Sequence, residues 1–354
     1  MRIVVDVAPL SHPRTGVGNY VRGSLIGMAE AGGHELVAFA PASLAGRREI
    51  RAALDGIDVE QRLPLVPAAH ALRTVWSRAG RPPVESLAGA LDVFHFSDWM
   101  YPAQRGGLRS TMVHDLVPIH FPEWVHARTL RMHREKYRHA ARTCDVVIAN
   151  SRYTADDVAG TLSIPRERVH VAYPGVEPVF STAGERADLG RPYVLTVATL
   201  EPRKNLSTLV DAYELLGDLD HSLAVAGAAG WGEQPMLDVP GVIRLGFTSH
   251  ERLPSLYRGA SVVVYPSLFE GFGMPVVEAM ACGVPVVASS HASLDEACGD
   301  AALRADPRDP ASIATAIRTA LEGRDELVTR GLAHARTFTW GENGRAHLAA
   351  WRAA

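Results

Sequence analysis

Two glutamates eight residues apart, Glu270 and Glu278, are the side chains in this sequence best placed to do chemistry. They lie in the stretch EGFGMPVVEAMACGVPVV, just after the apolar, β-branched run Ser261–Tyr265. Such a run suits a strand that is buried on both faces, and Pro266 ends it. The sequence therefore predicts a strand followed by a loop over residues 267–273, with Glu270 in the loop.

A helix is expected directly after this loop. Pro275 suits the first residue of a helix, because its missing N–H would have no partner there, and Gly283 suits the end. Gly271 and Gly273 remove side chains where a backbone can approach a ligand closely. A second buried strand, Val284–Ala288, follows at once. Strand, loop, helix and strand then form one right-handed parallel crossover.

This arrangement favours the recognition of a phosphorylated sugar compound. The free N–H groups and the positive dipole end of a helix attract phosphate. Glu278, in the first turns of the helix, can accept two hydrogen bonds from a vicinal diol such as ribose. Glu270 can accept from sugar hydroxyls on the other side of the phosphate. The alternative is that Glu278 only complements the helix dipole and that Glu270 is a solvated carboxylate.

The composition limits the classes of protein that fit. A chain of 354 residues with 47% hydrophobic residues is comfortable as two domains with full cores. A formal charge of −3 does not suggest a nucleic-acid-binding protein. The three cysteines read as reduced, buried thiols rather than a disulfide or zinc framework; they are Cys144, Cys282 and Cys298. The apolar run in the first residues, MRIVVDVAPL, is too short for a signal peptide. No apolar run in the sequence is long enough for a membrane span. We therefore expect a cytoplasmic protein.

The first half of the chain reads as alternating strands and helices. A strand over Arg2–Val7, a helix over Val17–Gly32 and a strand over Glu35–Ala40 open it, with TGVGNY at the first strand-to-helix turn. This is no dinucleotide fingerprint, because Val21 replaces the third glycine and the second strand ends without an acid. Residues 47–89, which include the segment 62–83, give no clear pattern.

Two further features of this half are candidates for function. His114 and Asp115 end the short strand Thr111–Val113, at the carboxyl edge where open α/β sheets bind ligands, so we expect an exposed His–Asp pair. The predicted helix Glu123–Thr143 is strongly basic. A solvated helix face, an anionic acceptor and a membrane surface are the alternatives for it. Its basic residues are Arg128, Arg131, Arg134, Lys136, Arg138 and Arg142.

The second half starts afresh after the Pro- and Gly-rich segment Tyr173–Pro178. A strand over Tyr193–Ala198 is followed by a loop to Lys204 and by a helix over Asn205–Leu216, with Asn205 as its cap. The alternation repeated twice predicts the α/β class, with two doubly wound, Rossmann-like parallel-sheet domains facing each other across a cleft that holds ligand. The predicted divisions are residues 1–175, residues 176–338 and a last helix at 339–354.

Taken together, these motifs resemble those of the retaining, nucleotide-sugar-dependent glycosyltransferases of family 4, which have the two-domain GT-B fold. The segments that carry the resemblance are TGVGNY, HD, NSRYTADDV, PGVEPVF, LEPRKN, the E-x7-E unit and FTW. The resemblance implies transfer of a hexose from a nucleotide diphosphate sugar to an acceptor hydroxyl, with retention of anomeric configuration. It also implies that the segment 62–83 lines the acceptor side and that the last helix crosses back to the N-terminal domain.

The resemblance assigns roles to individual residues. His114 and Glu270 would position the sugar, Glu278 would hold the ribose, and Arg203 with Lys204 would neutralise the diphosphate. Asp115, beside His114, is counted with His114, Arg203, Lys204 and Glu270 among the catalytic residues. Many members carry the arginine earlier, at the position of Ala198 or Thr199, so Arg203 either replaces it or leaves the phosphate to Lys204. Adjacent loop residues seldom point the same way, which favours Lys204. The implied donor-binding set is Gly16, Gly18, Thr199, Arg203, Lys204, Glu270, Gly271, Phe272, Gly273, Met274, Pro275 and Glu278.

No metal site and no resident cofactor are expected. The one Asp-x-Asp match, Asp218-Leu-Asp220, falls between a helix and a strand at the amino edge of the sheet, so we interpret it as a surface turn. GDP-mannose is the first expectation for the donor, with UDP-glucose and a deoxysugar nucleotide next. The acceptor is a glycan, a lipid-linked molecule or a small molecule, and peripheral contact with the inner face of the membrane stays open.

Other functions remain open on the same fold. These are a sugar-nucleotide epimerase, a phosphorylase with lysine-bound pyridoxal phosphate, a glycoside hydrolase that uses Glu270 and Glu278 as an acid–base pair, and a non-catalytic sugar-binding protein.

Overall fold

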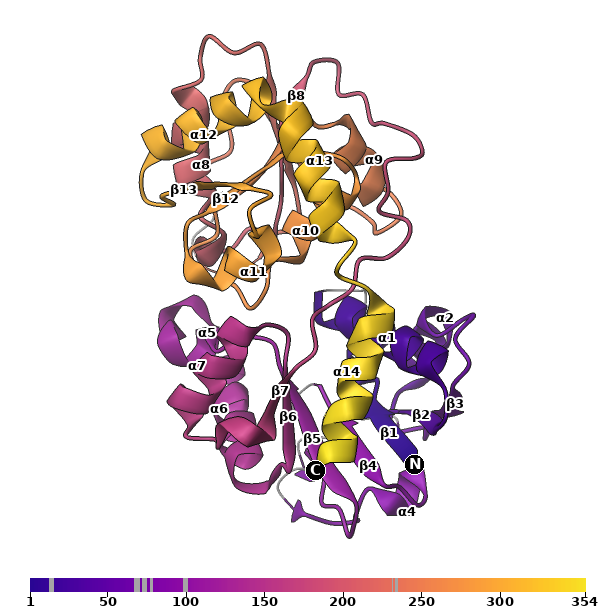
Figure 1. Ribbon diagram of the computed structural model, residues 1–354. Helices are drawn as coiled ribbons and strands as arrows, with labels where there is room; N and C mark the ends of the chain where they lie inside the picture. The colour runs from indigo at the N-terminus through magenta and orange to yellow at the C-terminus, as the bar shows by residue number, and fades with distance from the viewer. Residues whose placement is uncertain are drawn as a thin grey trace. The chain divides into compact units, whose positions relative to one another are not determined.

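The computed structural model describes residues 1–12, 16–66, 71, 75–76, 79–97, 101–230, 232 and 235–354. It consists of two compact units, each with its own sheet (Figure 1). Unit 1 comprises Met1–His120, Ala127–Gly175 and Thr339–Ala354, and unit 2 comprises Phe121–His126 and Val176–Phe338. Thr15 of the TGVGNY turn and part of the segment 62–83 lie outside the described residues.

Unit 1 contains a seven-stranded parallel sheet in the order β3-β2-β1-β4-β5-β6-β7. The strands are β1 (Arg2–Asp6), β2 (Glu35–Phe39), β3 (Glu60–Arg62), β4 (Val93–Phe96), β5 (Leu108–Val113), β6 (Val146–Ala149) and β7 (Val169–Val171). Its helices are α1 (Gly16–Ala31), α2 (Leu44–Ala53), α4 (Glu85–Ala88), α5 (Val117–His120), α6 (Ala127–Thr143), α7 (Arg152–Leu162) and α14 (Trp340–Ala353). Successive residues of β1 face opposite cores, Ile3 and Val5 one and Val4 the other, as in a sheet covered on both faces.

Helix α14 belongs to the core of unit 1, where it lies against α1 (Figure 1). The two helices approach so closely that a Cβ on Gly27 would lie 1.7 Å from the Trp340 carbonyl oxygen, and one on Gly344 2.1 Å from the carbonyl carbon of Gly27. Trp351 Nε1 donates to Ser110 Oγ at 2.8 Å, and Asn343 Nδ2 donates to the Tyr173 carbonyl oxygen at 2.7 Å. The end of the chain therefore completes the core that its beginning starts.

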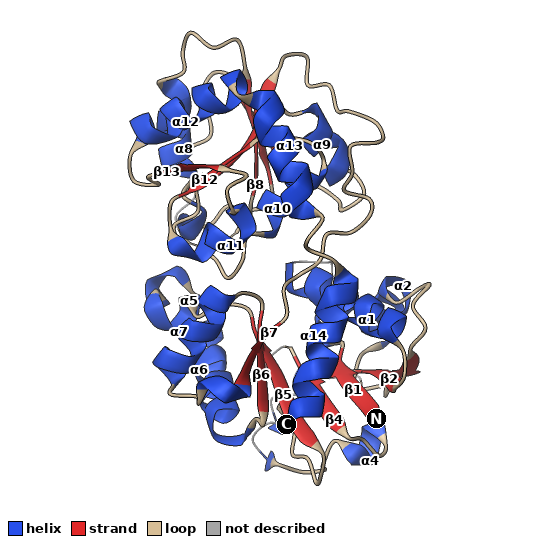
Figure 2. Cartoon of the chain, viewed as in Figure 1, coloured by secondary structure: helices blue, strands red, loops and turns tan. Residues whose placement is uncertain are grey.

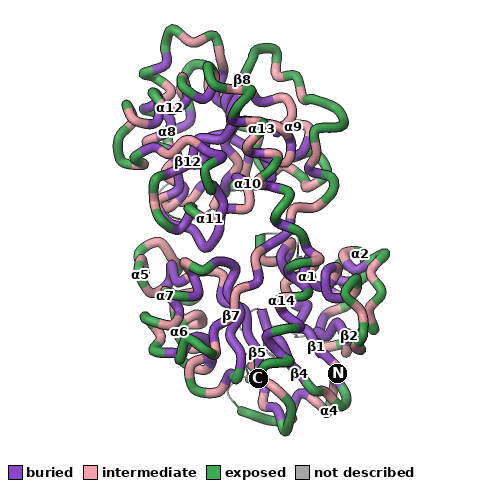
Figure 3. The backbone as a smooth tube through the Cα atoms, in the orientation of Figure 1, coloured by how far each residue is buried: buried purple, intermediate pink, exposed green. Residues whose placement is uncertain are grey.

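Unit 2 contains a six-stranded parallel sheet in the order β10-β9-β8-β11-β12-β13 (Figure 2). The strands are β8 (Tyr193–Val197), β9 (Ser222–Ala226), β10 (Val242–Gly246), β11 (Val262–Tyr265), β12 (Val286–Ser289) and β13 (Leu303–Ala305). Its helices are α8 (Leu206–Glu214), α9 (Leu253–Gly259), α10 (Met274–Ala281), α11 (Asp295–Cys298), α12 (Pro310–Glu322) and α13 (Arg324–Ala335). The central strands are buried along their length (Figure 3), as their β-branched runs predict.

Helix starts show where sequence signals succeed and where they fail. Ser151 caps α7 by accepting from Thr154 N at 2.9 Å, as its position predicts. Asn205 makes no such cap: its side-chain amide instead donates to the carbonyl oxygens of Pro266 and Pro307. Asn205 therefore ties three loops together, which needs partners that are distant in sequence.

The segment Phe121–His126 lies within the predicted first domain but is part of unit 2. The Phe121 ring stacks on Trp124 with centroids 4.2 Å apart and meets the Phe269 ring at 5.4 Å. Aromatic contacts of this kind hold the segment against the loop that carries Glu270. No helix in the described part of the chain combines the length and hydropathy that a membrane span requires.

Candidate functional site

The sheet of unit 2 reverses its strand order between β8 and β11, and the loops that follow these two strands carry the predicted donor residues. Parallel sheets of this kind bind ligands at the carboxyl ends of the strands, at the point of reversal. The loop after β8 runs to Lys204 and the loop after β11 carries Glu270. A hydrogen bond from Leu268 N to the Arg203 carbonyl oxygen, at 2.9 Å, joins them.

A buried ion cluster lies where these loops meet. Lys204 Nζ donates to Glu270 Oε1 at 2.6 Å, and Arg203 Nη1 donates to Glu270 Oε2 at 2.9 Å. Lys204 and Glu270 are each only 7% exposed. Burial alone would raise the pKa of Glu270, but the charges of Arg203 and Lys204 outweigh it and lower the pKa to about 2. Glu270 is therefore an ionised, buried carboxylate and not a solvated one.

Arg203 and Lys204 point to the same carboxylate, contrary to the expectation that adjacent loop residues diverge. Neighbouring side chains of the 3-10 turn Pro202–Lys204 diverge by about 120°, but both are long enough to reach Glu270, each at one carboxylate oxygen. Arg203 Nε also pairs with Glu201 Oε2 at 3.1 Å. Two cations and two carboxylates therefore balance each other in the described part of this site.

A tyrosine hydroxyl also contacts the ammonium group of Lys204. Lys204 Nζ donates to Tyr265 Oη at 2.8 Å, and Tyr265, the last residue of β11, is buried. Burial and the neighbouring Arg203 charge lower the pKa of Lys204, and its contacts with Glu270 oppose that shift. The sequence predicts Tyr265 only as a core residue of the strand, because nothing in a β-branched run distinguishes a tyrosine that contacts a lysine.

The glycine loop and the start of α10 are shaped by packing. Gly273 has a φ of +103°, and a Cβ there would lie 2.5 Å from Leu294 Cδ2, so only glycine fits. Helix α10 begins at Met274, one residue before the expected Pro275, with Gly273 at its N-cap. Gly271 and Phe272 are buried, and the Phe272 ring packs edge-on against Phe338 at 5.1 Å.

Glu278 lies on α10 and is 8% exposed. Burial raises its pKa to about 7, while a hydrogen bond from Tyr257 and the nearby His250 pull the value down. Tyr257 Oη donates to Glu278 Oε2 at 3.0 Å. The nearby His250 Nε2 lies 3.3 Å from Glu177 Oε1. A buried carboxylate whose pKa is raised toward neutral pH is a candidate functional group, and the role of Glu278 in binding ribose stays a prediction.

Two glycines after β9 pack closely against the loop that follows β8, and the sequence alone gave them no role. A Cβ on Gly227 would lie 1.8 Å from the Ala198 carbonyl oxygen, and one on Gly230 2.6 Å from the Leu200 carbonyl oxygen. Thr199, which lies between Ala198 and Leu200 in the sequence, is exposed. The glycines at the end of β9 were the available signal, since glycine directly after a buried strand often marks close backbone approach.

In unit 1, His114 and Asp115 follow β5 as predicted but do not form an exposed pair. Burial lowers the pKa of His114 to about 3, so its ring is neutral, and Nε2 has no hydrogen-bond partner among the described residues. The ring meets Tyr20 edge-on at 5.1 Å. Asp115 Oδ1 instead accepts from Val117 N at 3.0 Å at the start of α5, which is a turn-forming role.

The remaining glycine candidates are at the start of α1. Gly16 is the first residue of α1, and a Cβ there would meet no atom within 4 Å of the described residues. Gly18 is buried, and a Cβ would make only ordinary contacts at 3.7 Å or more. Packing within the described part of the chain therefore does not require glycine at either position.

The basic helix α6 divides its charges between two faces. Lys136 is buried, and its Nζ donates to the carbonyl oxygens of Ser97 and Met112 at 2.9 and 2.8 Å, so it is no part of a basic surface. The five arginines are exposed: Arg128, Arg131, Arg134, Arg138 and Arg142. Their contact with an anionic acceptor or a membrane stays a prediction.

The Asp-x-Asp match lies in a surface turn, as expected. Asp218 pairs with Arg318, and Asp220 pairs with Arg191. Both carboxylates are therefore occupied by arginines. Within the described ranges, no three His, Cys, Asp or Glu side chains are grouped so that they could hold a metal ion.

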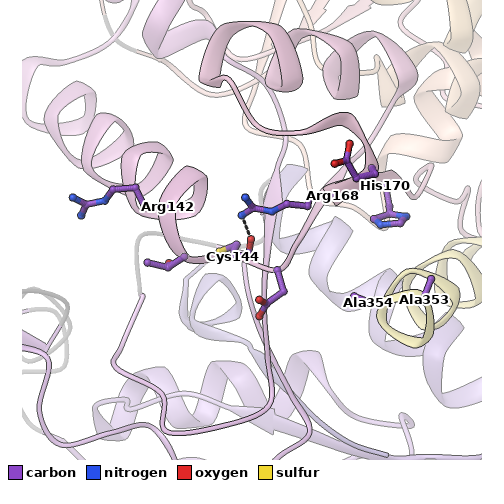
Figure 4. Close-up of a pocket in the computed structure, with 9 residues that line it drawn as sticks. Arg142, Cys144, Arg168, His170, Ala353 and Ala354 are labelled. Atoms are coloured by element: carbon purple, nitrogen blue, oxygen red, sulfur yellow. Dashed lines mark hydrogen bonds between the residues drawn. The ribbon is translucent and has the colours of Figure 1, made fainter.

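A cavity of about 590 Å³ in unit 1 lies away from these residues (Figure 4). Arg142, Arg168 and His170 line it beside the last residues of α14, and Arg168 donates to the Cys144 carbonyl oxygen. These residues stand at the amino ends of β6 and β7, whereas His114 follows the carboxyl end of β5. None of the predicted catalytic or donor-binding residues therefore lines this cavity.

Comparison with known proteins agrees with this fold and site. The model of glycosyl transferases group 1 matches residues 181–336, and that of glycosyltransferase family 4 matches residues 14–180. The chain is 28% identical to O-antigen chain mannosyltransferase B of Escherichia coli, over 96% of each protein.

Solved structures share the fold at low identity. Sucrose-phosphate synthase of Thermosynechococcus elongatus superposes with a TM-score of 0.72 at 18% identity, covering 100% of this chain and 99% of that one. HepE of Anabaena in complex with UDP-glucose gives 0.69 at 19% identity, covering 100% of both chains. Two Rossmann-like parallel sheets, two adjoining family models and these neighbours lead to one assignment. The chain belongs to the GT-B glycosyltransferases, as a family 4-like member.

Proposed function

We propose that this glycosyltransferase moves a hexose from a nucleotide diphosphate sugar to an acceptor hydroxyl with retention of anomeric configuration, using neither a metal ion nor a resident cofactor. The observation that carries the proposal is the buried cluster of Arg203, Lys204 and Glu270 at the carboxyl edge of the unit 2 sheet. Cleaving a sugar–diphosphate bond leaves negative charge on the phosphate, and fixed cations stabilise it best in a site that excludes water.

Each residue has a role in this proposal. Lys204 and Arg203 bind the diphosphate together with N–H groups at the Gly273–Met274 start of α10. Glu278 accepts from the ribose hydroxyls. Glu270, His114 and Asp115 orient the hexose, and the neutral ring of His114 can both donate and accept. The loop residues Gly16, Gly18, Thr199, Gly271, Phe272 and Pro275 complete the donor site.

For the chemical step we propose front-side attack, in which the leaving phosphate takes the proton of the acceptor hydroxyl. The C1–phosphate oxygen bond breaks, the acceptor oxygen–C1 bond forms on the same face, and the proton ends on the diphosphate. Glu270 is held by two cations and has a pKa of about 2, which suits an orienting carboxylate better than a base. Retention follows because attack and departure share one face.

GDP-mannose is the proposed donor, with UDP-glucose and a deoxysugar nucleotide as the next choices. The support is that the relative matched over 96% of this chain is called a mannosyltransferase. A panel of sugar nucleotides tests it by thermal shift and by slow donor hydrolysis, since a ligand that binds the native state raises Tm. A panel in which UDP-glucose but not GDP-mannose raises Tm contradicts the donor assignment.

The same preparation tests retention and metal independence. We expect an α-linked donor to give an α-linked product by NMR of the anomeric proton, and turnover to survive EDTA. A β-linked product overturns retention. Turnover that EDTA abolishes and Mg²⁺ or Mn²⁺ restores overturns the electrostatic role given to Arg203 and Lys204.

One observation favours a second function, glycoside hydrolysis. The pKa values of Glu270 and Glu278, about 2 and about 7, diverge as they do in a base and acid pair. Each carboxylate, however, already accepts from buried partners: Lys204 and Arg203 for Glu270, and Tyr257 for Glu278. Release of nitrophenol from nitrophenyl hexosides without any nucleotide would support hydrolysis; we expect none.

A further inference from the structure

Four arginines line a second cavity, in unit 2, of about 620 Å³. It lies at the amino end of the sheet, because Tyr193, the first residue of β8, lines it, whereas Lys204 follows the other end of that strand. A strand of five residues separates the two regions by roughly 15 Å. The arginines are Arg186, Arg191, Arg258 and Arg324.

Close backbone packing forms the walls of this cavity. Ala187 N donates to the Ser255 carbonyl oxygen at 2.9 Å, and Tyr193 Oη donates to that of Leu256 at 2.8 Å. A Cβ on Gly259 would lie 2.3 Å from the Ala187 carbonyl oxygen. The segment 186–193 is therefore fixed against the end of α9, and the cavity is preformed.

Most of the guanidinium hydrogen bonds here go to neutral groups. Arg258 donates to the carbonyl oxygens of Glu185 and Ser181 at 2.8 and 3.2 Å, and Arg324 donates to that of Ser261. Such bonds position a guanidinium without compensating its charge. Arg186 has no hydrogen bond or ion pair with any described residue.

Carboxylates offset only part of the charge. Asp220 pairs with Arg191 from outside the cavity, and Asp188 is the acid among the lining residues, with Oδ1 accepting from Gly190 N at 2.8 Å. Burial and the charge of Arg186 lower the pKa of Arg324, and Asp325 opposes the shift. Arg186 and Arg324 therefore repel each other across the cavity, and an anion between them would relieve that repulsion.

The structure assigns this cavity as a binding site for a small phosphorylated anion, separate from the donor site. Guanidinium groups bind phosphate oxygens through paired, charge-assisted hydrogen bonds, and several arginines around one hollow suit a dianion. The unit 1 cavity provides the contrast. There Arg142 and Arg168 stand beside Asp145 and Glu167, so its charges balance.

Pyrophosphate is a suitable probe, measured by isothermal titration on the full chain. Because the donor site also binds diphosphate, the measurement uses the Lys204→Ala background, in which that site is weakened. We expect pyrophosphate still to bind there, and Arg186→Glu in the same background to weaken binding by about tenfold or more, the scale of a charge-assisted hydrogen bond. Arg244→Glu is the matched control, since it makes the same change of charge at an exposed arginine of unit 2 outside the cavity.

Two outcomes overturn the assignment. One is no pyrophosphate binding in the Lys204→Ala background, which places all phosphate affinity at the donor loops. The other is equal affinity in Arg186→Glu and Arg244→Glu, which reduces the effect to general surface charge. Arg186 is exposed and makes no hydrogen bond or ion pair with described residues, so loss of folding is not expected, and circular dichroism of each variant checks it. Titrations at matched ionic strength in chloride exclude screening.

Discussion

Glu270 compensates the charge of the buried Lys204 and the partly buried Arg203, so in the proposed function the donor diphosphate has to take over contacts that the protein already makes. Lys204 and Arg203 each give one hydrogen bond to this carboxylate, at 2.6 and 2.9 Å. A phosphate oxygen that approaches them must compete with Glu270 or share the cations with it. Both cations, Arg203 and Lys204, should therefore act on the leaving group together.

We expect Lys204→Ala to lower kcat by about a hundred- to a thousandfold, the cost of losing one preorganised donor to developing charge. Arg203→Ala should lower kcat by more than about tenfold, because its guanidinium reaches the same carboxylate and can replace the arginine missing at Ala198. Steady-state kinetics with Arg244→Ala as the surface control measures both. Near-normal kcat in Lys204→Ala would show that the diphosphate binds elsewhere.

Ionisation of the buried Glu278 lowers the stability of the fold, and a neutral side chain at this position removes that penalty. Its pKa of about 7 lies above the ordinary value of 4.5, so the folded state binds this proton more tightly and ionisation destabilises the fold as pH rises through that interval. We expect Glu278→Gln to raise the free energy of unfolding at pH 8 by up to about 3 kcal/mol, and to have little effect at pH 4.5.

The same variant should bind donor more weakly, because the amide loses charge-assisted hydrogen bonds worth about 1.5–3 kcal/mol each. Donor affinity of the wild type should rise as pH increases through about 7 and then level off. Denaturant titration and calorimetric binding at several pH values check both halves. A variant that is no more stable at pH 8 and binds donor normally returns Glu278 to a structural role.

At this scale the sequence revealed charged residues but not their neighbours. The E-x7-E spacing and the basic pair identified Glu270, Glu278 and Lys204, because charged residues between buried strands are rare and conspicuous. Tyr257 and Tyr265, which hold two of these groups, stayed hidden in apolar runs. Their role depends on which strand lies beside which, and a local pattern does not contain that information.

At the scale of elements, close backbone approach shapes the loops of the donor site. Gly227 packs its Cα against the Ala198 carbonyl oxygen, at the base of the loop that ends in Lys204. Helix and strand spans followed from apolar periodicity, and the strand alternation placed both sheets. The membership of Phe121–His126 in unit 2 did not follow, because aromatic contacts with Phe269 decide it.

We expect Gly227→Ala to destabilise unit 2 by about 2 kcal/mol or more, since a Cβ 1.8 Å from a carbonyl oxygen forces the backbone to move. Donor affinity should fall with it, because the displaced loop carries Arg203 and Lys204. The control is Gly160→Ala on α7, where a Cβ meets nothing within 4 Å and helix propensity predicts a gain of up to about 1 kcal/mol. Equal melting temperatures for the two variants would contradict this account.

At the scale of the whole molecule, two of the points where the chain passes between its units are neighbours. Apart from the short segment Phe121–His126, the chain leaves unit 1 after Gly175 and returns after Phe338. Val176 N donates to the Phe338 carbonyl oxygen at 3.0 Å, and a Cβ on Gly175 would lie 2.2 Å from Trp340 N. The two passages therefore run side by side. A Pro- and Gly-rich segment predicted the first of them, and its pairing with the second needed the structure.

Helix α14 has a consequence for biosynthesis. The core of unit 1 needs Asn343 and Trp351, which the ribosome makes only after residues 176–338 of unit 2. At about 5–20 residues per second, the first 175 residues wait roughly ten to thirty seconds for their closing helix. Unit 1 should therefore close only once α14 has left the exit tunnel. Nascent chains stalled with residues 1–338 outside the ribosome and α14 still in the tunnel should resist protease in unit 2 and be cut in unit 1, and a protected unit 1 at that stage would rule this order out.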